Sequence, residues 1–246
     1  MKFLITIFVA AVASVSAFAP SSLSARPSVA VSETIKDLEV LAAKANPVIK
    51  FYDPLQLSTT TIFNDSEEAT IGFLRHAEIK HGRVAMAAFV GYIVQYNGIH
   101  WPTPINLAGD PYPFAAGSPP EQWDALSDPA KWQIILFVGF LEWFSEIGGT
   151  HYMRGGVPGA YPNFSDSPDT IPHPVPLNLY DPFGFSKNAS AEQKASGLVK
   201  EINNGRLAML GIMGFLAEQK LEGSVPFLKI YNLVSHYDGE PMAPFG

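Results

Sequence analysis

The chain has 246 residues, no cysteine and a formal net charge of −7. Without cysteine it can form neither disulfides nor thiolate metal sites, and its acidic balance argues against binding to nucleic acid. Apolar residues make up 47% of the sequence and charged residues only 16%, against roughly 25% charged residues in soluble domains. The composition therefore favours a membrane protein.

The first 30 residues have the pattern of two targeting signals in series. In residues 1–17, Lys2 precedes an apolar run, and Val15-Ser16-Ala17 has the spacing of a signal-peptide cleavage site. Residues 18–30 are rich in serine, contain Arg26 and lack acids, as transit peptides do. Such a bipartite presequence predicts import into a secondary plastid through the secretory route, and it leaves 31–246 as the expected folded domain.

The first long helix is predicted over residues 67 to about 98, after a short helix at 31–46 and an extended segment at 51–64. Its start is polar, and residues 84–96 contain no charge. The stretch from Glu78 to Gly98 is about long enough to cross a hydrocarbon core of roughly 30 Å. We therefore expect this helix to span a membrane.

Two further long helices are expected, the middle one over 129 to about 148 and the third over 191 to about 222. Residues 97 to about 130 are predicted to be a proline-rich loop without lysine or arginine, and 226–236 a short interfacial helix. Basic residues gather where the first and third helices start and after the middle one ends. By the positive-inside tendency, these three ends lie on the same side of the membrane.

The first and third helices carry the same nine-residue motif. The sequence Glu-Ile-Lys-His-Gly-Arg-Val-Ala-Met at 78–86 returns as Glu-Ile-Asn-Asn-Gly-Arg-Leu-Ala-Met at 201–209. An Asp-Pro dipeptide precedes each copy, at 53–54 and at 181–182. A repeat of a whole structural unit predicts two matched helices that cross about a local two-fold axis.

The charges of the motif predict ion pairs between the two copies. Glu78 and Arg83 are five residues apart, so they do not face each other on one helix. An unpaired charge at bilayer depth costs roughly 2.5 to 3.5 kcal/mol. We therefore expect each carboxylate to pair with the arginine of the other copy, as Glu78–Arg206 and Glu201–Arg83.

The motif also offers ligands for magnesium. His81 and Asn204 each lie three residues after the glutamate, on the same helix face. Magnesium prefers oxygen ligands, and a magnesium ion already held by the four nitrogens of a macrocycle needs a single further ligand. Glu78, His81, Glu201 and Asn204 are therefore candidate axial ligands, and the glycine at 82 or 205 would leave room for a flat ring against the backbone.

Two other interpretations use the same residues. Glu78 and His81 have the Glu-x-x-His spacing of di-iron four-helix bundles, but the second copy has Asn204, a poor iron ligand. A purely structural role, in which the glutamates and arginines only hold two helices together, would leave His81 and Asn204 unused. No nucleophile–base pair or phosphate-binding loop is evident, so we do not expect an enzyme.

The doubled motif, the paired Asp-Pro dipeptides and the three helices resemble the light-harvesting chlorophyll-binding proteins over residues 51–222. The presequence and the short loops are most similar to the fucoxanthin-chlorophyll a/c branch. The resemblance implies an all-α membrane protein of the plastid thylakoid, with three transmembrane helices of which the first and third cross. It implies chlorophyll a, chlorophyll c, fucoxanthin and related carotenoids as cofactors, and a photosystem core and other antenna subunits as partners.

The resemblance also assigns residues to pigments. It places chlorophyll magnesium on the four motif ligands, and further chlorophylls on Gln133 and Glu142 of the middle helix. A late ligand of the third helix falls on Glu218, next to Gln219. The central carotenoids would rest near the Asp-Pro dipeptides, Asp53-Pro54 and Asp181-Pro182.

The implied function is light harvesting, in which fixed pigments pass excitation energy to a photosystem without bond chemistry. The alternative is photoprotective quenching of excitation by a protein of the same fold. Quenching would use acids exposed to the lumen, for which the proline-rich loop offers Asp110, Glu121, Asp124 and Asp128.

Overall fold

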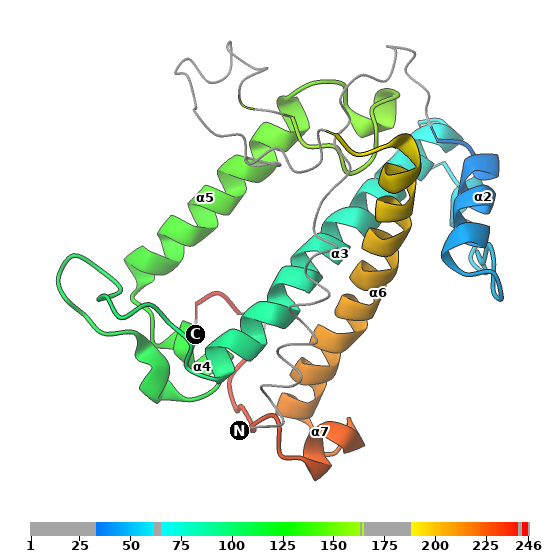
Figure 1. Cartoon of the computed structure of the whole chain (residues 1–246). Coiled ribbons are helices and arrows are strands. Elements are labelled where there is room, and N and C mark those ends of the chain that lie inside the picture. The colour runs from blue at the N-terminus through cyan, green and yellow to red at the C-terminus, as the bar shows by residue number, and fades with distance from the viewer. Residues whose placement is uncertain (1–32, 62–64, 163, 165–187, 241–242, 246) are drawn as a thin grey trace. The chain divides into compact units, whose positions relative to one another are not determined.

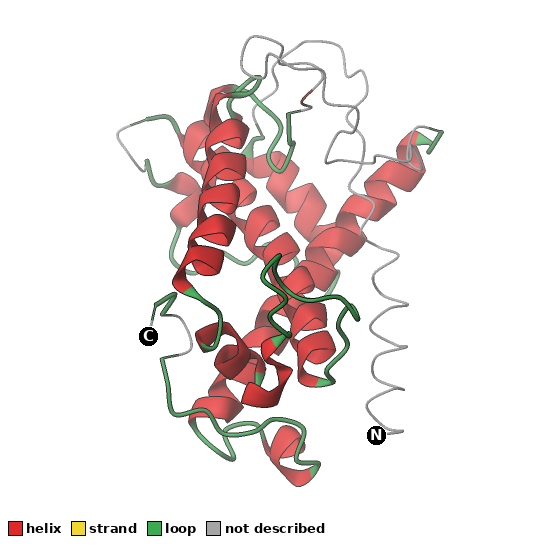
Figure 2. Cartoon of the chain, turned by 90° about the vertical axis from the view of Figure 1, so that its left-hand side faces the viewer, coloured by secondary structure: helices red, strands yellow, loops and turns green. Residues whose placement is uncertain are grey.

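The computed structural model describes residues 33–61, 65–162, 164, 188–240 and 243–245. Within these residues all regular structure is helical (Figure 2). The two targeting signals at 1–17 and 18–30, and the second Asp-Pro dipeptide at 181–182, lie outside the described residues. The all-α architecture is confirmed.

The helices of the structure lie close to the predicted ones (Figure 1). The short helix α2 spans Ile35–Ala45, and the long helices are α3 (Glu67–Tyr96), α5 (Asp128–Ile147) and α6 (Ala191–Lys220), followed by α7 (Pro226–Ile230). Single 3₁₀ turns form at η1 (Leu57–Thr59), η3 (Pro113–Ala116) and η4 (Tyr152–Arg154). In the described part of the chain, no helix is both long enough and apolar enough to cross a membrane, so the transmembrane part of the prediction is not confirmed.

The prediction of an uninterrupted loop over 97–130 is wrong, because helix α4 spans Pro119–Asp124. The Ser118 backbone N–H and hydroxyl both donate to Glu121 Oε2, at 2.6 and 2.8 Å. This is a Ser-x-x-Glu capping box with proline in the first turn, where a missing N–H does no harm. The sequence signal was present, but the high proline content of the segment hid it.

The described chain divides into two compact units. One contains Val84–Phe140 and the residues from Leu207 onward, and the other contains the residues up to Arg83 together with Leu141–Arg206. The boundary therefore passes through each of the three long helices, and in α3 and α6 it falls directly after the arginine of the repeated motif.

In the second unit, α3 and α6 cross at Gly82 and Gly205 (Figure 1). Both glycines are buried. A Cβ atom added to Gly205 would lie 2.9 Å from the Cα of Gly82, and one added to Gly82 would lie 3.1 Å from the Cα of Gly205. These glycines let two helix backbones touch, so the role we predicted for them, as space for a flat ring, is corrected. The glycine at the fifth position of one motif copy contacts the glycine at the fifth position of the other copy, as a local two-fold axis requires.

In the first unit, the later halves of α3 and α6 pack through a small apolar core. Ala85, Met86 and Ala208 are buried together, and Phe89 packs against them. The Phe89 ring stacks on Phe215 with centroids 5.0 Å apart. The core therefore continues the contact between α3 and α6 beyond the charged motif.

Helix α5 exposes large apolar side chains around most of its circumference in the first unit. Between 43% and 64% of the surface of each is exposed for Ile134, Leu136, Phe137, Val138 and Phe140. A helix on the surface of a water-soluble domain shows one apolar face and one polar face. Helix α5 therefore lacks the wide polar face of such a helix over residues 134–140.

Candidate functional site

Both ion pairs that the repeat predicts are present between α3 and α6. Arg83 Nε lies 2.6 Å from Glu201 Oε1, and Arg206 Nη2 lies 2.7 Å from Glu78 Oε1. Charge-assisted pairs of this length are strong hydrogen bonds as well as ion pairs. The residues of these two ion pairs belong to the same motif as Gly82 and Gly205. One short sequence therefore supplies both the close approach of the two helices and the neutralisation of the two glutamates.

The two pairs differ in their surroundings. Glu201 is buried with 7% of its surface exposed, and its partner Arg83 also donates to the Gly159 carbonyl at 2.6 Å. Glu78 is less buried and accepts from a second arginine, Arg75, whose Nε lies 3.2 Å from a Glu33 carboxylate oxygen. Sequence reasoning missed Arg75, although its i,i+3 spacing from Glu78 is a recognisable signal.

Near the crossing, His81 and Asn204 have side-chain atoms with free lone pairs, which are able to act as metal ligands. His81 is exposed, and its Nδ1 lies 2.7 Å from the Ala77 carbonyl oxygen. A carbonyl can only accept, so Nδ1 carries the hydrogen and Nε2 keeps its lone pair. Asn204 is half-buried, and its side chain makes no hydrogen bond within the described residues. An imidazole held by a backbone carbonyl is oriented as a metal ligand is.

The glutamates of the motif differ in the oxygens they leave free. Glu201 uses Oε1 for Arg83, and its Oε2 accepts no hydrogen bond from the described residues. Glu78 uses both oxygens, Oε1 for Arg206 and Oε2 for Arg75. Glu201 therefore offers the less occupied carboxylate.

The two predicted ligands of the middle helix have different environments. Gln133 is exposed on α5 and makes no side-chain hydrogen bond within the described residues. Glu142 pairs with Lys80 through Oε2 and accepts from the Tyr161 hydroxyl through Oε1 at 3.3 Å. The link between Lys80 and Glu142 had no sequence signal, because the two residues belong to different helices and to no repeat.

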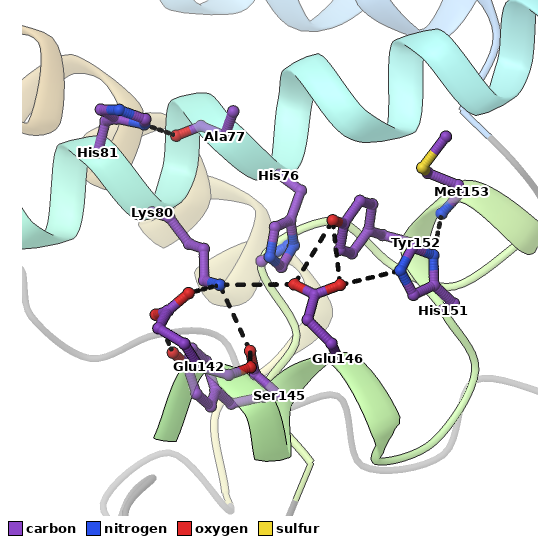
Figure 3. Close-up of polar contacts among 12 residues, drawn as sticks. His76, Ala77, Lys80, His81, Glu142, Ser145, Glu146, His151, Tyr152 and Met153 are labelled. Carbon is purple, nitrogen blue, oxygen red and sulfur yellow. Dashed lines mark hydrogen bonds and ion pairs between the residues drawn. The ribbon is translucent and has the colours of Figure 1, made fainter. Parts of the chain in front are cut away.

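A polar cluster surrounds Glu146 near the end of α5 (Figure 3). Its carboxylate accepts from the Tyr152 hydroxyl at 3.2 Å, lies 2.9 Å from His151 Nε2 and lies 3.7 Å from Lys80 Nζ. Burial, and then the charge of Glu146, raise the pKa of Tyr152 to about 12. The Tyr152 ring stacks on His76 with centroids 3.9 Å apart. The cluster thus fastens the η4 turn to the start of α3.

No group of three or more His, Asp or Glu side chains in the described residues is arranged to hold a metal ion. The Glu146 carboxylate instead faces the charge of Lys80 and accepts a hydrogen bond from the Tyr152 hydroxyl. The di-iron interpretation therefore finds no site in this part of the chain.

At the end of α6, the structure separates the roles of two adjacent residues. Glu218 accepts the backbone N–H groups of Gly223 and Val225, both at 2.8 Å, so each of its oxygens is used to hold the turn before α7. Gln219 is fully buried, and neither its Nε2 nor its Oε1 has a hydrogen-bond partner among the described residues. Gln219 therefore has an amide oxygen without a hydrogen bond, whereas each oxygen of the predicted Glu218 already accepts one.

The first Asp-Pro dipeptide forms a capped turn. Asp53 accepts the N–H groups of Leu57 and Ser58 at 3.0 and 2.8 Å, at the start of η1. Hydrogen bonds from Ser58, and more weakly from Leu57, lower the pKa of the Asp53 carboxyl. Pro54 is exposed beside it. Asp181 and Pro182, the matching dipeptide, lie outside the described residues.

Comparison with known proteins identifies the family. Residues 38–220 match the family model described as chlorophyll A-B binding protein. The chain is 33% identical over 223 residues to a fucoxanthin-chlorophyll a-c binding protein of Trieres chinensis, covering 87% of this chain and 93% of the relative. It is 34% identical over 227 residues to fucoxanthin-chlorophyll a-c binding protein F of Phaeodactylum tricornutum, covering 90% and 96%. The chain belongs to the chlorophyll A-B binding protein family.

Proposed function

We propose that this chain is a light-harvesting antenna protein that binds chlorophyll a, chlorophyll c, fucoxanthin and related carotenoids. The observation that carries the proposal is the crossed pair of contacts, Arg83–Glu201 and Arg206–Glu78. These contacts neutralise the carboxylates while His81 Nε2 and the Asn204 amide oxygen stay free. A site of this kind suits magnesium that already has four ligands.

The proposed magnesium ligands at the crossing are Glu78, His81, Glu201 and Asn204. Each supplies one oxygen or nitrogen, which is what a chlorophyll magnesium lacks. When bound, the chlorophylls absorb light and exchange excitation energy. The protein fixes their spacing and orientation, and it needs no catalytic residue for this, so we do not propose an enzyme.

Outside the crossing, the proposed ligands are Gln133, Glu142 and Glu218, with Gln219 as a further candidate. Gln133 lies on the exposed apolar surface of α5. Glu142 remains a candidate because a carboxylate oxygen paired with a lysine keeps a lone pair. Glu218 remains a candidate for the same reason, since each of its oxygens also keeps a lone pair, and Gln219 is added because a buried amide without a partner is unfavourable unless a ligand satisfies it.

The carotenoids are proposed to rest beside the Asp53-Pro54 and Asp181-Pro182 dipeptides. At the first of these, the capped turn fixes the backbone and leaves Pro54 exposed. A rigid turn with an exposed apolar ring suits contact with an extended apolar pigment.

We further propose that α3, α5 and α6 are embedded in the thylakoid membrane, which the protein reaches by way of the presequence at 1–30. Support comes from the exposed apolar surface of α5 and from the paired charges at the start of the apolar runs. The proposed partners are a photosystem core and other antenna subunits. Retention in thylakoid membranes after an alkaline carbonate wash tests the membrane proposal, and release into the supernatant would contradict it.

The direct test of function is to purify the complex and extract its pigments for chromatography. We expect chlorophyll a, chlorophyll c and carotenoid, and we expect the excitation spectrum of chlorophyll a fluorescence to contain bands of the other two. A colourless polypeptide would overturn the proposal. Fluorescence lifetime against pH separates the two functions, because a lifetime that shortens on acidification would favour photoprotective quenching over light harvesting.

A further inference from the structure

The segment between α3 and α4 exposes large apolar side chains although it is a loop (Figure 1). Leu107 is fully exposed, Trp101 is 76% exposed and Ile99 is 51% exposed. All three lie in the unit that contains Val84–Phe140. A group of exposed apolar side chains in one segment marks a surface that contacts a partner or a membrane.

The tip of this loop, from Ile105 to Asp110, is closed by its own hydrogen bonds. The Ile105 N–H donates to the Asp110 carbonyl at 2.9 Å. The Asn106 amide donates to Asp110 Oδ2 at 2.7 Å, and its Oδ1 accepts from the Asp110 N–H at 3.0 Å. Gly109, with a φ of 91°, makes a turn that a residue with a side chain would resist. Leu107 therefore projects from a fixed backbone.

The base of the loop is packed as well. The His100 ring stacks on Tyr112 with centroids 5.0 Å apart. The Phe114 ring lies against Gly98, where an added Cβ would meet it at 2.6 Å. The loop is thus held both at its base and at its tip, so its apolar side chains lose little backbone freedom when they contact another surface.

The loop has few backbone N–H groups that need water. Proline has no N–H, and residues 99–114 contain four prolines, at positions 102, 104, 111 and 113. The N–H groups of Ile105, Gly109 and Asp110 donate within the loop. An unpaired N–H is costly where water is scarce. The loop is therefore suited to the boundary between lipid headgroups and acyl chains.

The charge of the loop indicates which kind of lipid surface it fits. Residues 84–130 contain no lysine or arginine, and basic residues are what attracts a chain to anionic headgroups. The one charged side chain in residues 99–114 is Asp110, which accepts from Asn106. Tryptophan, present here at Trp101, is enriched at membrane–water interfaces. The loop therefore matches a lipid surface with uncharged headgroups.

We propose that this loop inserts Leu107 and Trp101 into the interface of a bilayer with uncharged headgroups. The inference rests on the proposed embedding of the long helices, because the loop starts directly after Tyr96 ends α3. A stable protein interface buries about 800 Å² on each partner, and a narrow projecting tip offers far less. Insertion into lipid requires no partner surface of matching shape.

The test uses the absence of cysteine from the chain. Leu107→Cys carrying a nitroxide label is prepared in the full pigment-reconstituted chain, in vesicles of digalactosyldiacylglycerol, whose headgroup is uncharged. Electron paramagnetic resonance measures how often the label collides with oxygen and with a water-soluble nickel chelate. We expect several-fold more frequent collision with oxygen. Labelled Asp238→Cys is the control, because Asp238 is 98% exposed in the same unit, and it should show the reverse.

Labelled Leu136→Cys reports on the embedding itself, since Leu136 is 64% exposed on α5. If the label at 136 meets oxygen and the label at 107 meets nickel, the inference is wrong and the embedding stands. If both labels meet nickel, the embedding fails and the inference fails with it. An immobilised label at 107 that meets neither reagent is covered by protein, which also overturns the inference. Adding phosphatidylglycerol should not raise the oxygen preference, and a rise would contradict the choice of uncharged headgroups.

A further variant tests the closure of the tip. Asn106→Ala removes both side-chain bonds to Asp110. In the protein labelled at 107, it should raise collision with nickel several-fold and make the nitroxide more mobile. Thr103→Ala is the control, because Thr103 is exposed and its side chain makes no hydrogen bond within the described residues. An unchanged signal in Asn106→Ala would overturn the role assigned to the closure.

Discussion

Arg83 and Glu201 form a nearly isolated pair, with Nε and Oε1 2.6 Å apart, whereas the equivalent Glu78 is shared by Arg206 and Arg75. The sequence repeat makes these two pairs equivalent, but the structure does not. The difference arises because Arg75 has no counterpart in the second copy, where residue 198 is Leu.

Removal of the two arginines should therefore have unequal effects. Arg83→Leu leaves the buried Glu201 without a counter-charge and should destabilise the complex by roughly 3 to 5 kcal/mol, which abolishes pigment assembly. Arg206→Leu leaves Arg75 beside Glu78 and should lose about 1 kcal/mol or less, as partly exposed pairs do. The effects of both substitutions are measured by the yield of reconstituted complex and by its thermal denaturation. Normal yield from Arg83→Leu, or equal losses, would contradict the asymmetry.

Replacement of the crossing glycine should separate the helices. Gly205→Ala places a Cβ 2.9 Å from the Cα of Gly82, and overpacking of this kind costs roughly 1 to 3 kcal/mol. Gly91→Ala, where the added atom meets nothing within 4 Å, should instead stabilise the helix by about 0.5 to 1 kcal/mol. Opposite shifts in the denaturation midpoint are expected, and a neutral Gly205→Ala would show that the helices do not touch there.

His81→Phe should remove one chlorophyll and leave the fold intact, because the imidazole is exposed and only its Nδ1 is hydrogen-bonded. His100→Phe is the control, since His100 is also exposed and also bonds a backbone carbonyl through Nδ1, at 2.8 Å. Pigment counting and circular dichroism of both variants are the measurements. A full chlorophyll complement in His81→Phe means that the imidazole is not a ligand.

The neighbours Glu218 and Gln219 should respond differently to substitution. Gln219→Leu should lose one chlorophyll with little loss of stability, since it removes a buried amide that has no partner in the described chain. Glu218→Ala should release the turn before α7 and lower the denaturation midpoint. Loss of a chlorophyll from both variants to the same extent, with unchanged stability, would assign a ligand role to Glu218 as well.

Tyr237 should make stability depend on alkaline pH. Its hydroxyl donates to Asp124 at 2.6 Å, and this bond, together with burial, raises the pKa of Tyr237 from its ordinary value of about 10 to about 12. A raised pKa means that the stabilisation is complete below about pH 10 and is lost as the pH rises towards 12. Tyrosinate absorbance should show several late-titrating groups, Tyr152 among them, and Tyr237→Phe should remove one of these groups. An unchanged titration curve in that variant would exclude the shift.

Much of the fold follows from local patterns along the chain. The three long helices follow from long runs with few helix breakers, and their observed ends lie close to the predicted ones. The crossed ion pairs also followed, because the acid and the base of one copy are five residues apart and do not face each other, whereas the other copy supplies the matching charge. The repeat thus supplied long-range information that an ordinary sequence lacks.

The remaining features needed the tertiary structure. Lys80 and Glu142 are 62 positions apart with no repeat to link them, and only the packing of α5 beside α3 shows that they pair. The distinction between Glu218 and Gln219 depends on which side chain the following turn uses, and helical spacing carries no record of that.

The sequence by itself determined which residues are chemically able to hold pigments and which helices must neutralise each other, because residue type and periodicity are local properties. The tertiary structure alone decided which of those atoms remain free, and that Gly82 and Gly205 serve the helix contact. The physical reason is that occupancy of a lone pair and the close approach of two backbones depend on residues brought together from distant parts of the chain.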